Sequence, residues 1–326
     1  MTTRLVVIGA GFLGSALALG AAHRGWSVCV IGRSDPFDTG SAEPAAGELQ
    51  FLPGDGLERL PEVLDQEVDA VVLAASGRFP IPSAAAPAAE AIDTLSLVIG
   101  VCEAVRSVSP ATKVAFLSSA GAVYAPGDGL KSESDRCEPT SPYGMSRRMG
   151  EEWLEYYHRE HGLSTHSLRC VNIYGRLLPQ SRGQGVVSAA FRSALTNTSF
   201  TQHGDGGQAR DFIHVDDFVT ATLELLGSGR GIPQTVNVGT GTASSITEVL
   251  EAVSAATGSL IVTTPGPSRY TDTGRLSVDP SLLKQFVDFE PLDLDAGIRR
   301  MARDITDGGS IPEPEPATGA QKVDTK

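Results

Sequence analysis

The chain has 326 residues, which is enough for one large domain or two coupled ones with a sizeable core. It carries 26 basic and 39 acidic residues, a formal net charge of -13, and no basic stripe, which argues against nucleic acid as a partner. An acidic protein of this kind would need a few local arginines and helix N-termini to hold a phosphorylated ligand.

The first half of the chain alternates short apolar runs with stretches of helical periodicity. Strands are predicted at 4–9 and 26–32, and within "ELQFLPGD", "VDAVVLAAS" and "TKVAFLSS". Helices are predicted between them, one from Phe12 to a stop at Gly25 and the clearest at 86–108. Buried strands that alternate with helices predict an α/β fold, a Rossmann-like doubly wound parallel sheet covered on both faces.

A further helix is predicted from about 142 to 161, followed by a sixth strand in "STHSLRCVNIY". Four large apolar side chains recur along this helix at spacings of four, four and three residues: Met145, Met149, Trp153 and Tyr156. Residues at these spacings share one face of a helix, and we interpret this face as the one that packs on the core.

The alternation loosens beyond about residue 175, where loops separate a helix at 184–196 from the run "DFIHVDDFVTATLELL". We therefore predict a first domain at 1–174 and a smaller, partly interleaved substrate-binding lobe at 175–306, with some segments returning to the first domain. The segment 307–326 is rich in Pro, Gly and charge and has no apolar pattern, which predicts a disordered tail.

Cysteine usage and hydropathy predict a cytoplasmic protein. Four cysteines occur, none in a CxxC pair, which is typical of a reducing compartment and supplies no framework for a metal site. The apolar N-terminus lacks the basic lead and cleavage pattern of a signal peptide. No apolar run reaches about 18 residues, so neither a membrane span nor a membrane partner is expected.

The segment "VIGAGFLGS" carries Gly9, Gly11 and Gly14 as GxGxxG, where a predicted strand ends and a helix begins. In that context Gly9 allows the tight turn, Gly11 lets a pyrophosphate approach the backbone, and Gly14 lets helix and strand pack closely. The N–H groups of the first helical turn, which includes Phe12 and Leu13, would then bind the phosphates. The pattern predicts that domain 1–174 binds a dinucleotide; glycines that serve packing alone are the alternative.

The end of the second strand bears on the choice of dinucleotide. An NAD site usually has Asp or Glu there to bind the ribose 2′-hydroxyl, whereas this chain has Gly32, Arg33 and Ser34. Arg33 would attract a 2′-phosphate and could stack on adenine, so the sequence favours NADP(H), with NAD(H) as the alternative. Alternatively, Arg33 is an ordinary exposed loop arginine that binds neither dinucleotide. Asp55, after the third strand, is a candidate contact to the adenine amino group.

Six motifs follow one another along the chain: "GAGFLG", "SSAGAVY", "SPYGMSR", "LRCVNIYG", "GDGGQARDFIHVDD" and "NVGTG". With them the chain resembles the extended short-chain dehydrogenase/reductases, and among these the nucleotide-sugar epimerase, dehydratase and ketoreductase group. The resemblance runs from about residue 4 to about residue 305. It is specific, because a generic dinucleotide fold has no reason to carry "RDFIHVDD" and "NVGTG".

The resemblance implies that Tyr143 and Arg147 form the family's Tyr-x-x-x-Lys pair, with arginine in the place of lysine. The phenol of Tyr143 would exchange a proton with a sugar hydroxyl during hydride transfer, and a nearby cation favours the phenolate form. Arg147 keeps the charge and can donate to the cofactor ribose, although its flat head differs in shape from an ammonium group. The family's substrate-orienting Ser or Thr falls on Ala120, so Ser119 is the substitute, and Ser118 is expected to pack in the strand.

The resemblance also implies residues that hold the sugar nucleotide. Four positions match the family's contacts to its phosphates and nucleoside: Asn172, Arg210, Arg269 and Asp272. Two arginines on one diphosphate offer charge-assisted, bidentate hydrogen bonds. The acids of "VDD" look like a paired-carboxylate site, but N-capping of the following helix is the expected role for one of them, Asp216 or Asp217.

These implications converge on hydride transfer at C4 of a nucleotide-linked hexose bound between the two lobes. Because no acid is present at Gly32, an exchanged NADPH is favoured, and we expect a 4-ketoreductase that acts on a dTDP-4-keto-6-deoxyhexose. A 4-epimerase of the UDP-hexose type, which retains its NAD, is the alternative. A dehydratase is disfavoured because "SSAGAVY" lacks the usual acidic pair, and a non-catalytic dinucleotide sensor would fit the departures at Arg147 and Ala120.

The resemblance finally implies an oligomeric state. Family members often dimerise through the helix after the fourth strand and the Tyr-bearing helix, which form a four-helix contact. We therefore expect a homodimer, although the apolar stretch at 86–108 is also compatible with plain core packing.

Overall fold

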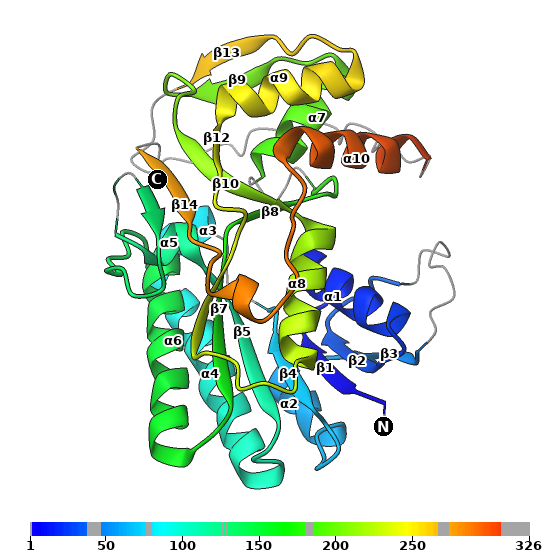
Figure 1. The fold of residues 1–326 in the computed structure, drawn as a ribbon, viewed down its shortest axis with the longest axis vertical. Coiled ribbons are helices and arrows are strands. Elements are labelled where there is room, and N and C mark those ends of the chain that lie inside the picture. Colours follow the sequence, from blue (N-terminus) through cyan, green and yellow to red (C-terminus); the bar gives the residue numbers. More distant parts are fainter. Residues whose placement is uncertain are drawn as a thin grey trace, which may run out of the picture.

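The computed structural model describes residues 2–37, 47–75, 80–125, 127, 129–179, 185–266 and 274–307, with residues 80–82 as backbone only. Its largest feature is a seven-stranded sheet in the order β11-β7-β5-β4-β1-β2-β3 (Figure 1). The strands are β1 Arg4–Ile8, β2 Ser27–Gly32, β3 Leu49–Pro53, β4 Ala70–Leu73, β5 Lys113–Ser119, β7 Thr165–Cys170 and β11 Thr235–Val238. Every neighbouring pair in this sheet runs parallel, which confirms the predicted doubly wound α/β fold.

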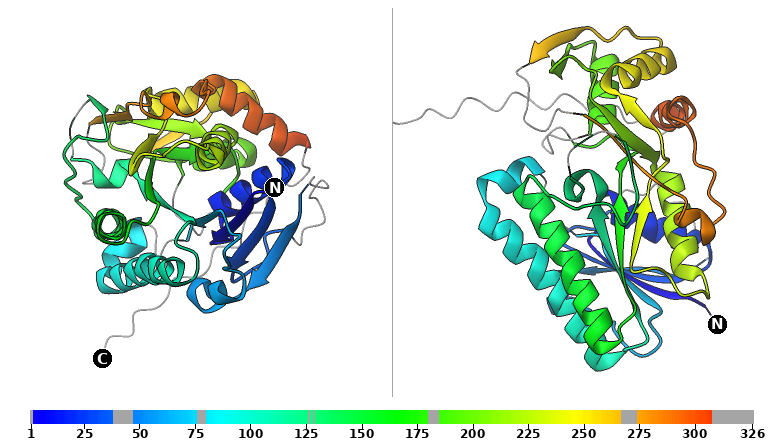
Figure 2. Two further views of the ribbon diagram at one scale, coloured as in Figure 1. Left: turned by 60° about the horizontal axis from the view of Figure 1, so that its bottom comes forward. Right: turned by 60° about the vertical axis from the view of Figure 1, so that its left-hand side comes forward.

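Helices cover both faces of this sheet, as the two views in Figure 2 show. The helices on one face are α1 (Phe12–His23) and α8 (Val215–Gly227); those on the other are α2 (Gly56–Arg59), the 3-10 helix η1 (Leu60–Glu62), α4 (Pro87–Val108) and α6 (Pro142–His161). Successive side chains of a strand point to opposite faces. Val7 therefore packs with α1 and α8, while Val6 and Ile8 pack beneath α4 and α6. Short helices follow two of the strands: α3 (Pro80–Ala85) and α5 (Ala120–Val123).

A smaller lobe contains a mixed sheet with β12, β10, β14 and β6 in that order, β8 beside β10, and the separate pair β9 and β13 (Figure 1). Its strands are β6 Gly129–Lys131, β8 Asn172–Tyr174, β9 Phe200–His203, β10 Ala209–His214, β12 Ala243–Ser245, β13 Thr263–Gly266 and β14 Arg275–Val278. The helices are α7 Val186–Thr196, α9 Ile246–Thr257 and α10 Leu294–Asp307, and the 3-10 helix η3 is Leu283–Gln285. A second hydrophobic core, which includes Phe191, Val253 and Met301, holds α7, α9 and α10 together.

The predicted sixth strand is in fact two strands that belong to different lobes. β7 lies in the large sheet between β5 and β11, and β8 pairs with β10 in the smaller lobe. Val171 is the only residue between them, and its N–H donates to the Val238 carbonyl at 3.1 Å. Because β11 then returns to the edge of the large sheet, the chain passes between the lobes more than once.

The face of α6 that packs on the sheet is not the predicted one. Its buried residues are mostly small or charged: Gly144, Ser146, Arg147, Gly150, Glu151, Leu154 and Tyr157. Met145 is 52% exposed, Met149 and Tyr156 are exposed as well, and Trp153 is only partly buried. The prediction was wrong because close helix–sheet packing selects for small residues; a Cβ on Gly150 would lie 3.0 Å from the Phe116 ring.

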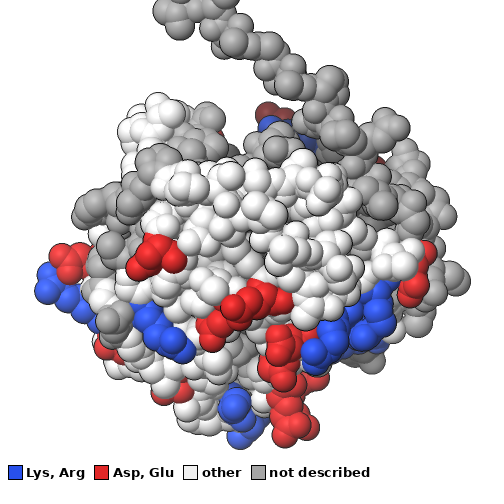
Figure 3. All heavy atoms as spheres, turned by 90° about the horizontal axis from the view of Figure 1, so that it is seen from above, with Lys and Arg blue, Asp and Glu red and all other residues white. Residues whose placement is uncertain are grey.

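Charged side chains of both signs are interspersed on the face of the molecule shown in Figure 3. None of the helices in the described part of the chain combines the length and apolar character needed to cross a bilayer. Within the same residues, no group of three or more His, Cys, Asp or Glu side chains is arranged to hold a metal ion.

Candidate active site

The glycine loop joins β1 to α1 at the point where the strand order reverses, since β4 lies on one side of β1 and β2 on the other. Open α/β sheets bind their ligands at such a switch point. Gly9 has a φ of +115°, and a Cβ there would overlap the backbone nitrogen of Ala75. A Cβ on Gly14 would overlap the Gly9 carbonyl oxygen. The loop therefore presents bare backbone where the sequence predicts a pyrophosphate.

The first turn of α1 leaves its amide groups available to a ligand. Gly11 occupies the N-cap position, and the first backbone bond that closes onto it comes from the Ser15 N–H at 2.9 Å. The N–H groups of Phe12 and Leu13 find no acceptor among the described residues. Unpaired amides at a helix N-terminus form an anion site, which is the role that the sequence assigns to them.

Tyr143 and Arg147 lie one turn apart at the start of α6. Ser141 caps this helix by accepting from the Gly144 N–H at 3.1 Å, and Pro142 is its first residue. The guanidinium carbon of Arg147 lies 4.8 Å from the centre of the Tyr143 ring and 5.0 Å from that of Phe116. The pair that the sequence singles out is thus in contact, with the cation held between two aromatic rings.

Arg147 is a buried cation with unused hydrogen-bond donors. It is 1% exposed, and Nη1 donates to the Leu117 carbonyl at 3.4 Å. Nε and Nη2 are buried and have no partner among the described residues. Buried polar groups are normally paired, so these two donors fit a ligand that supplies oxygen acceptors. A dinucleotide, with its ribose hydroxyls, fits both this guanidinium and the bare backbone of the glycine loop.

Three small residues at the end of β5 differ in environment. Ser119 is partly exposed and occupies the N-cap of α5 without making a side-chain cap bond. Ala120 is fully buried, so a hydroxyl at that position would face the core. Ser118 is buried and donates to Glu151 Oε1 at 2.6 Å, in line with the expected role in the strand. Of the two serines, Ser119 is the one with a hydroxyl available to a substrate.

The predicted contacts to adenosine lie at the ends of β2 and β3. Arg33 and Ser34 are exposed beyond β2. A Cβ on Gly32 would overlap the Cβ of Ala10, so the glycine loop itself leaves no room for a carboxylate side chain at that position. Asp55 caps α2, accepting through Oδ1 from the N–H groups of Leu57 at 2.9 Å and Glu58 at 3.4 Å. Its proposed contact to adenine stays a prediction.

Two of the residues assigned to the sugar nucleotide, Asn172 and Arg210, fall on the second lobe. Asn172 in β8 is exposed, and its side chain donates to the Asp211 carbonyl of the neighbouring β10 at 3.1 Å. Arg210 in β10 donates to the Gly274 carbonyl at 3.0 Å. Arg269 and Asp272 lie outside the described residues. Asn172 and Arg210 are thus brought onto adjacent strands, and their substrate roles stay predictions.

Two of the sequence motifs bind each other. Asp211 of "RDFIHVDD" is fully buried, and its Oδ1 accepts from the Thr240 hydroxyl at 2.6 Å while Oδ2 accepts from the Gly241 N–H at 3.0 Å. Thr240 and Gly241 belong to "NVGTG". Burial raises the pKa of Asp211, and the hydrogen bonds from Thr240 oppose that shift. The two motifs therefore fasten β10 to the loop after β11.

The acids of "VDD" do not cap α8, contrary to the expectation from sequence. His214 is the N-cap, and its Nδ1 accepts from the Asp216 N–H at 3.3 Å. Asp216 instead pairs with Arg300 of α10 at 2.7 Å, and Asp217 accepts from the Leu292 N–H at 3.0 Å. The strand continues to His214, so the aspartates fall inside the helix, where first-turn acids still favour the helix dipole.

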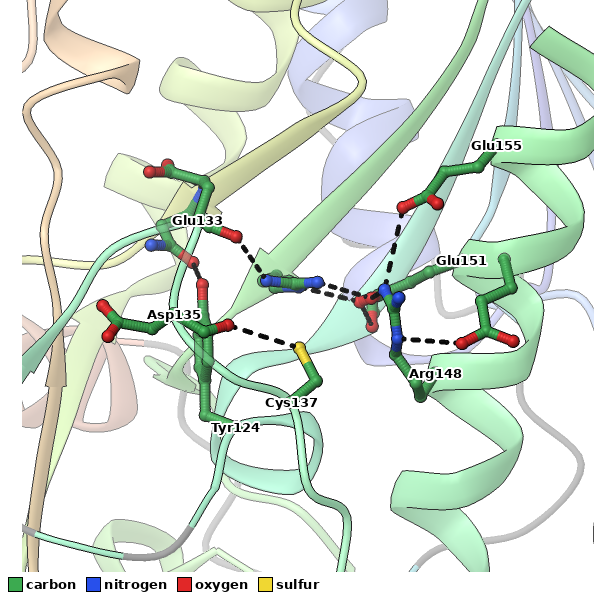
Figure 4. A network of polar contacts seen from close by, with 11 residues as sticks. Tyr124, Glu133, Asp135, Cys137, Arg148, Glu151 and Glu155 are labelled. Carbon is green, nitrogen blue, oxygen red and sulfur yellow. Dashed lines mark hydrogen bonds and ion pairs between the residues drawn. The ribbon is translucent and has the colours of Figure 1, made fainter. Parts of the chain in front are cut away.

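Sequence reasoning missed a buried ionic network beside Arg147 (Figure 4). Glu151 is 0% exposed and binds Arg169 of β7 through two bonds, from Nε at 3.0 Å and from Nη2 at 2.8 Å. Burial alone would lower the pKa of Arg169, but the Glu151 carboxylate raises it. A signal was present, because Glu151 follows Tyr143 and Arg147 at the same spacing of four, and Arg169 is a charged residue within a predicted strand.

A hollow of about 510 Å³ lies between α6 and the segment 133–139, with Arg169 of β7 and Thr235 of β11 also in its lining. Its lining includes Cys137, Arg148, Met149, Glu152 and Glu155. The carboxylates of Glu152 and Glu155 are engaged by Arg148 at 3.3 and 3.7 Å. Since its charges satisfy one another, this hollow contributes nothing to the candidate active site.

Comparison with known proteins agrees with this geometry. Residues 5–239 match the NAD dependent epimerase/dehydratase family. The chain is therefore an enzyme of the NAD-dependent epimerase/dehydratase family, the extended short-chain dehydrogenase/reductases that act on nucleotide sugars. The family resemblance drawn from the motifs is confirmed.

Individual relatives are similar over most of their length. A protein of Methanocaldococcus jannaschii named "Putative UDP-glucose 4-epimerase" is 31% identical over 252 residues, which is 76% of this chain and 80% of the relative. The dTDP-glucose 4,6-dehydratase of Xanthomonas campestris pv. campestris is 27% identical over 316 residues, 89% of each chain. The solved structure of a Thermus thermophilus UDP-glucose 4-epimerase in complex with NAD is 28% identical, with a TM-score of 0.80 over 95% of this chain and 100% of that one.

These relatives bear on two of the predictions from sequence. Their names favour the epimerase alternative over the 4-ketoreductase that we expected from Gly32. The family is NAD-dependent, and the T. thermophilus structure contains NAD, so the preference for NADP(H) receives no support from them.

Proposed function

We propose that the protein is a nucleotide-sugar 4-epimerase that retains NAD and inverts C4 of a UDP-hexose. The observation that carries the proposal is the buried Arg147 guanidinium, which lies on the Tyr143 ring and keeps two donors for a ligand. A guanidinium held there can anchor a ribose through charge-assisted hydrogen bonds beside the phenol.

Each residue has one task in this reaction. Tyr143 accepts the proton of the sugar 4-hydroxyl and returns it at the end of the cycle. NAD, held by the glycine loop and Arg147, would supply a reversible hydride acceptor for C4 of the sugar. Ser119 donates a hydrogen bond to the sugar oxygen, and Arg147 donates through Nε and Nη2 to ribose hydroxyls. One proton and one hydride leave and return, so no external reductant is consumed.

The choice of substrate and cofactor is supported by the relatives. The T. thermophilus protein is a UDP-glucose 4-epimerase, its structure contains NAD, and its fold matches nearly the whole of this chain. The second lobe supports an anionic substrate, because Asn172 and Arg210 lie on adjacent strands there. Two such polar groups suit a diphosphate in an otherwise acidic protein.

A 4-ketoreductase that exchanges NADPH is the second candidate, and one observation favours it. The position that usually carries the ribose-binding acid is Gly32, which the packing of Ala10 keeps free of a side chain, and the exposed Arg33 follows it. A 2′-phosphate would meet no carboxylate at that position.

A homodimer is part of the proposal. Met145, Met149 and Tyr156 form an exposed apolar stripe on α6, and Ile92 of the adjoining α4 is 64% exposed. Exposed apolar patches of this kind mark interaction sites, and a two-fold axis would let the same stripe cover itself. Analytical ultracentrifugation should give twice the chain mass; a monomer at micromolar concentration would contradict the dimer.

One preparation of the purified protein tests the function. We expect conversion of UDP-glucose to UDP-galactose without added dinucleotide, and NAD among the nucleotides that denaturation releases, identified by mass spectrometry. Stoichiometric consumption of NADPH with a 4-keto sugar nucleotide would instead identify the ketoreductase. Bound dinucleotide with no turnover of any sugar nucleotide would contradict both enzymes and leave a sensor.

A further inference from the structure

The network around Glu151 joins α6 to two neighbouring strands of the large sheet, β5 and β7 (Figure 4). Its carboxylate accepts four hydrogen bonds, two from Arg169, one from Ser118 and one from Arg148 at 3.1 Å. Ser118 of β5 and Arg169 of β7 are direct neighbours in the sheet register. One carboxylate therefore fixes the helix to two adjacent strands at the same level.

The other side of Arg169 holds the segment that leads into α6. Its Nη1 donates to the Glu133 carbonyl at 3.2 Å, and its guanidinium carbon lies 4.8 Å from the centre of the Tyr124 ring. Burial raises the pKa of Tyr124 to about 12, so its hydroxyl stays protonated and donates to Asn237 Oδ1 at 2.6 Å. Asn237 in turn donates to the Lys131 carbonyl at 2.9 Å. The polypeptide on both sides of Tyr143 is thus tied to one guanidinium.

The network adjoins the reacting groups without including them. Tyr143, Arg147 and Glu151 are spaced by four residues and share one face of α6. Two bonds connect this face to the end of β5: the long one from Arg147 to the Leu117 carbonyl, at 3.4 Å, and the short one from Ser118 to Glu151, at 2.6 Å. The residue after Ser118 is Ser119. The short bond from Ser118 therefore restricts the position of Ser119 relative to Tyr143 more than the long bond from Arg147 does.

We infer that Ser118, Glu151 and Arg169 are positioning residues, which hold Tyr143 of α6 in register with Ser119 of β5. Because Arg169, Arg148 and Ser118 saturate the Glu151 carboxylate, it does not draw Arg147 away from its ligand. The inference rests on the proposed function for what is positioned. In a purely structural role, by contrast, any side chains that fill the same space and keep the protein stable would support wild-type activity.

A compensated replacement separates the two roles. Removing one partner of a buried ion pair is destabilising, but replacing the whole pair with apolar residues of similar volume is often neutral. The triple variant S118A/E151L/R169M removes both charges together with the hydroxyl that would lose its acceptor. We expect it to unfold near the wild-type temperature and to bind dinucleotide unchanged, but to lose kcat at least about tenfold with little change in KM, since small misplacements of reacting groups cost that much or more.

Backbone hydrogen exchange supplies a readout that needs no activity. In the triple variant we expect faster exchange in residues 117–125 and in the first turn of α6, and unchanged exchange in α1. Wild-type kcat and wild-type exchange in a stable triple variant would overturn the inference. If wild-type protein epimerises no sugar nucleotide, the proposed function fails, whereas the exchange measurement still decides whether the network holds these segments.

A milder variant keeps the inference testable if the triple variant does not fold. Ser118→Ala removes only the bond between β5 and Glu151, and we expect kcat to fall several-fold at an almost unchanged melting temperature. Ser167→Ala is the matched control, because Ser167 is a buried serine of β7 whose hydroxyl has no partner among the described residues. Equal kcat in both serine variants would overturn the inference.

Discussion

Arg147 and Arg169 are buried to nearly the same degree, 1% and 3% exposed, yet their surroundings differ. Arg169 is paired with a carboxylate through two bonds and also donates to a backbone carbonyl. Arg147 has two aromatic rings, one long bond to a carbonyl and two donors without a partner in the described residues. The protein itself satisfies the hydrogen-bond donors of Arg169, whereas we propose that a ligand satisfies those of Arg147.

Arg169 and Arg147 show how a buried charge with a structural role differs from one with a proposed ligand-binding role. A buried ion costs several kcal/mol unless its hydrogen bonds are satisfied. For Arg169 the protein supplies the satisfying groups; for Arg147 we expect the dinucleotide to supply them. The two arginines should therefore respond in opposite ways to the same substitution.

Replacement by methionine gives the largest expected difference. In dinucleotide-free protein, Arg169→Met leaves the Glu151 carboxylate buried without its main partner, and we expect a loss of about 3–5 kcal/mol in the free energy of unfolding. Arg147→Met removes a cation that no carboxylate pairs within the described part of the chain, so the same measurement, urea unfolding, should show little loss or a gain. Similar losses in the two variants would contradict the comparison.

Dinucleotide binding should reverse this order. Arg147→Met should weaken NAD binding about tenfold or more, because hydrogen bonds from a charged donor contribute about 1.5–3 kcal/mol. The stable triple variant at Ser118, Glu151 and Arg169 should bind NAD like wild type. Isothermal titration of NAD into stripped protein measures both, and Arg147→Lys should fall between Arg147→Met and wild type.

Removal of the reacting hydroxyl should change the rate of reaction rather than dinucleotide binding. Tyr143→Phe removes only the hydroxyl, and we expect a loss of at least about a hundredfold in the rate of epimerisation, the low end of acid–base contributions. The ring that packs on Arg147 remains, so NAD binding and stability should change little. Tyr156→Phe on the exposed side of α6 is the matched control. Full activity in Tyr143→Phe would exclude Tyr143 as the proton carrier.

Much of the fold could be predicted from sequence because its signals are local. The strands β1, β2 and β5 are apolar runs, and the glycine pattern after β1 identifies a switch point without knowledge of the rest. What failed was the assignment of a helix face. On α6 the apolar stripe points outward, and the buried face carries Arg147 and Glu151. Partners on β5 and β7 offset the free-energy cost of burying these charges, and only the folded structure reveals those partners.

The sequence motifs identified individual side chains of the candidate site, but not the partners of those side chains in the folded protein. Tyr143 and Arg147 do lie together, and the distinction between Ser118 and Ser119 agrees with their environments. The roles of Asp211 and His214 were not predictable, because they depend on Thr240 and Asp216 lying within hydrogen-bond distance in the folded chain. Residue type alone does not determine whether a polar side chain joins two loops, caps a helix or takes part in catalysis. Its burial and its partners in the folded chain determine that role.

An exposed arginine provides a further test beside the two buried ones. Arg33 lies in solvent at the end of β2, so it should contribute only when a ligand brings a charge to it. We expect Arg33→Ala to weaken NADPH binding about threefold to tenfold and to leave NADH nearly unchanged, the range of a solvent-screened ion pair to a phosphate. Arg136→Ala, which is remote from the glycine loop, is the control. Equal weakening of the two dinucleotides would show that Arg33 does not read the 2′-phosphate.

A buried histidine provides the smallest expected effect. His166 of β7 is buried, its Nδ1 lies 3.0 Å from the Pro233 carbonyl and its Nε2 lies 2.9 Å from the Ser164 hydroxyl. Burial lowers the pKa of His166, and the bond to Pro233 opposes that shift. Unlike an arginine, this base can avoid a buried charge by losing its proton.

The pH dependence of stability follows from that difference. Below the ordinary histidine pKa of about 6.5 the unfolded chain binds a proton that folded His166 does not, so stability falls as the pH drops through the window beneath 6.5. Between pH 7.5 and 5.5 we expect His166→Gln to lose up to about 1 kcal/mol less than wild type in urea unfolding. His214, whose pKa burial also lowers, keeps part of the slope in the variant. An unchanged slope would mean that the fold tolerates a charged His166.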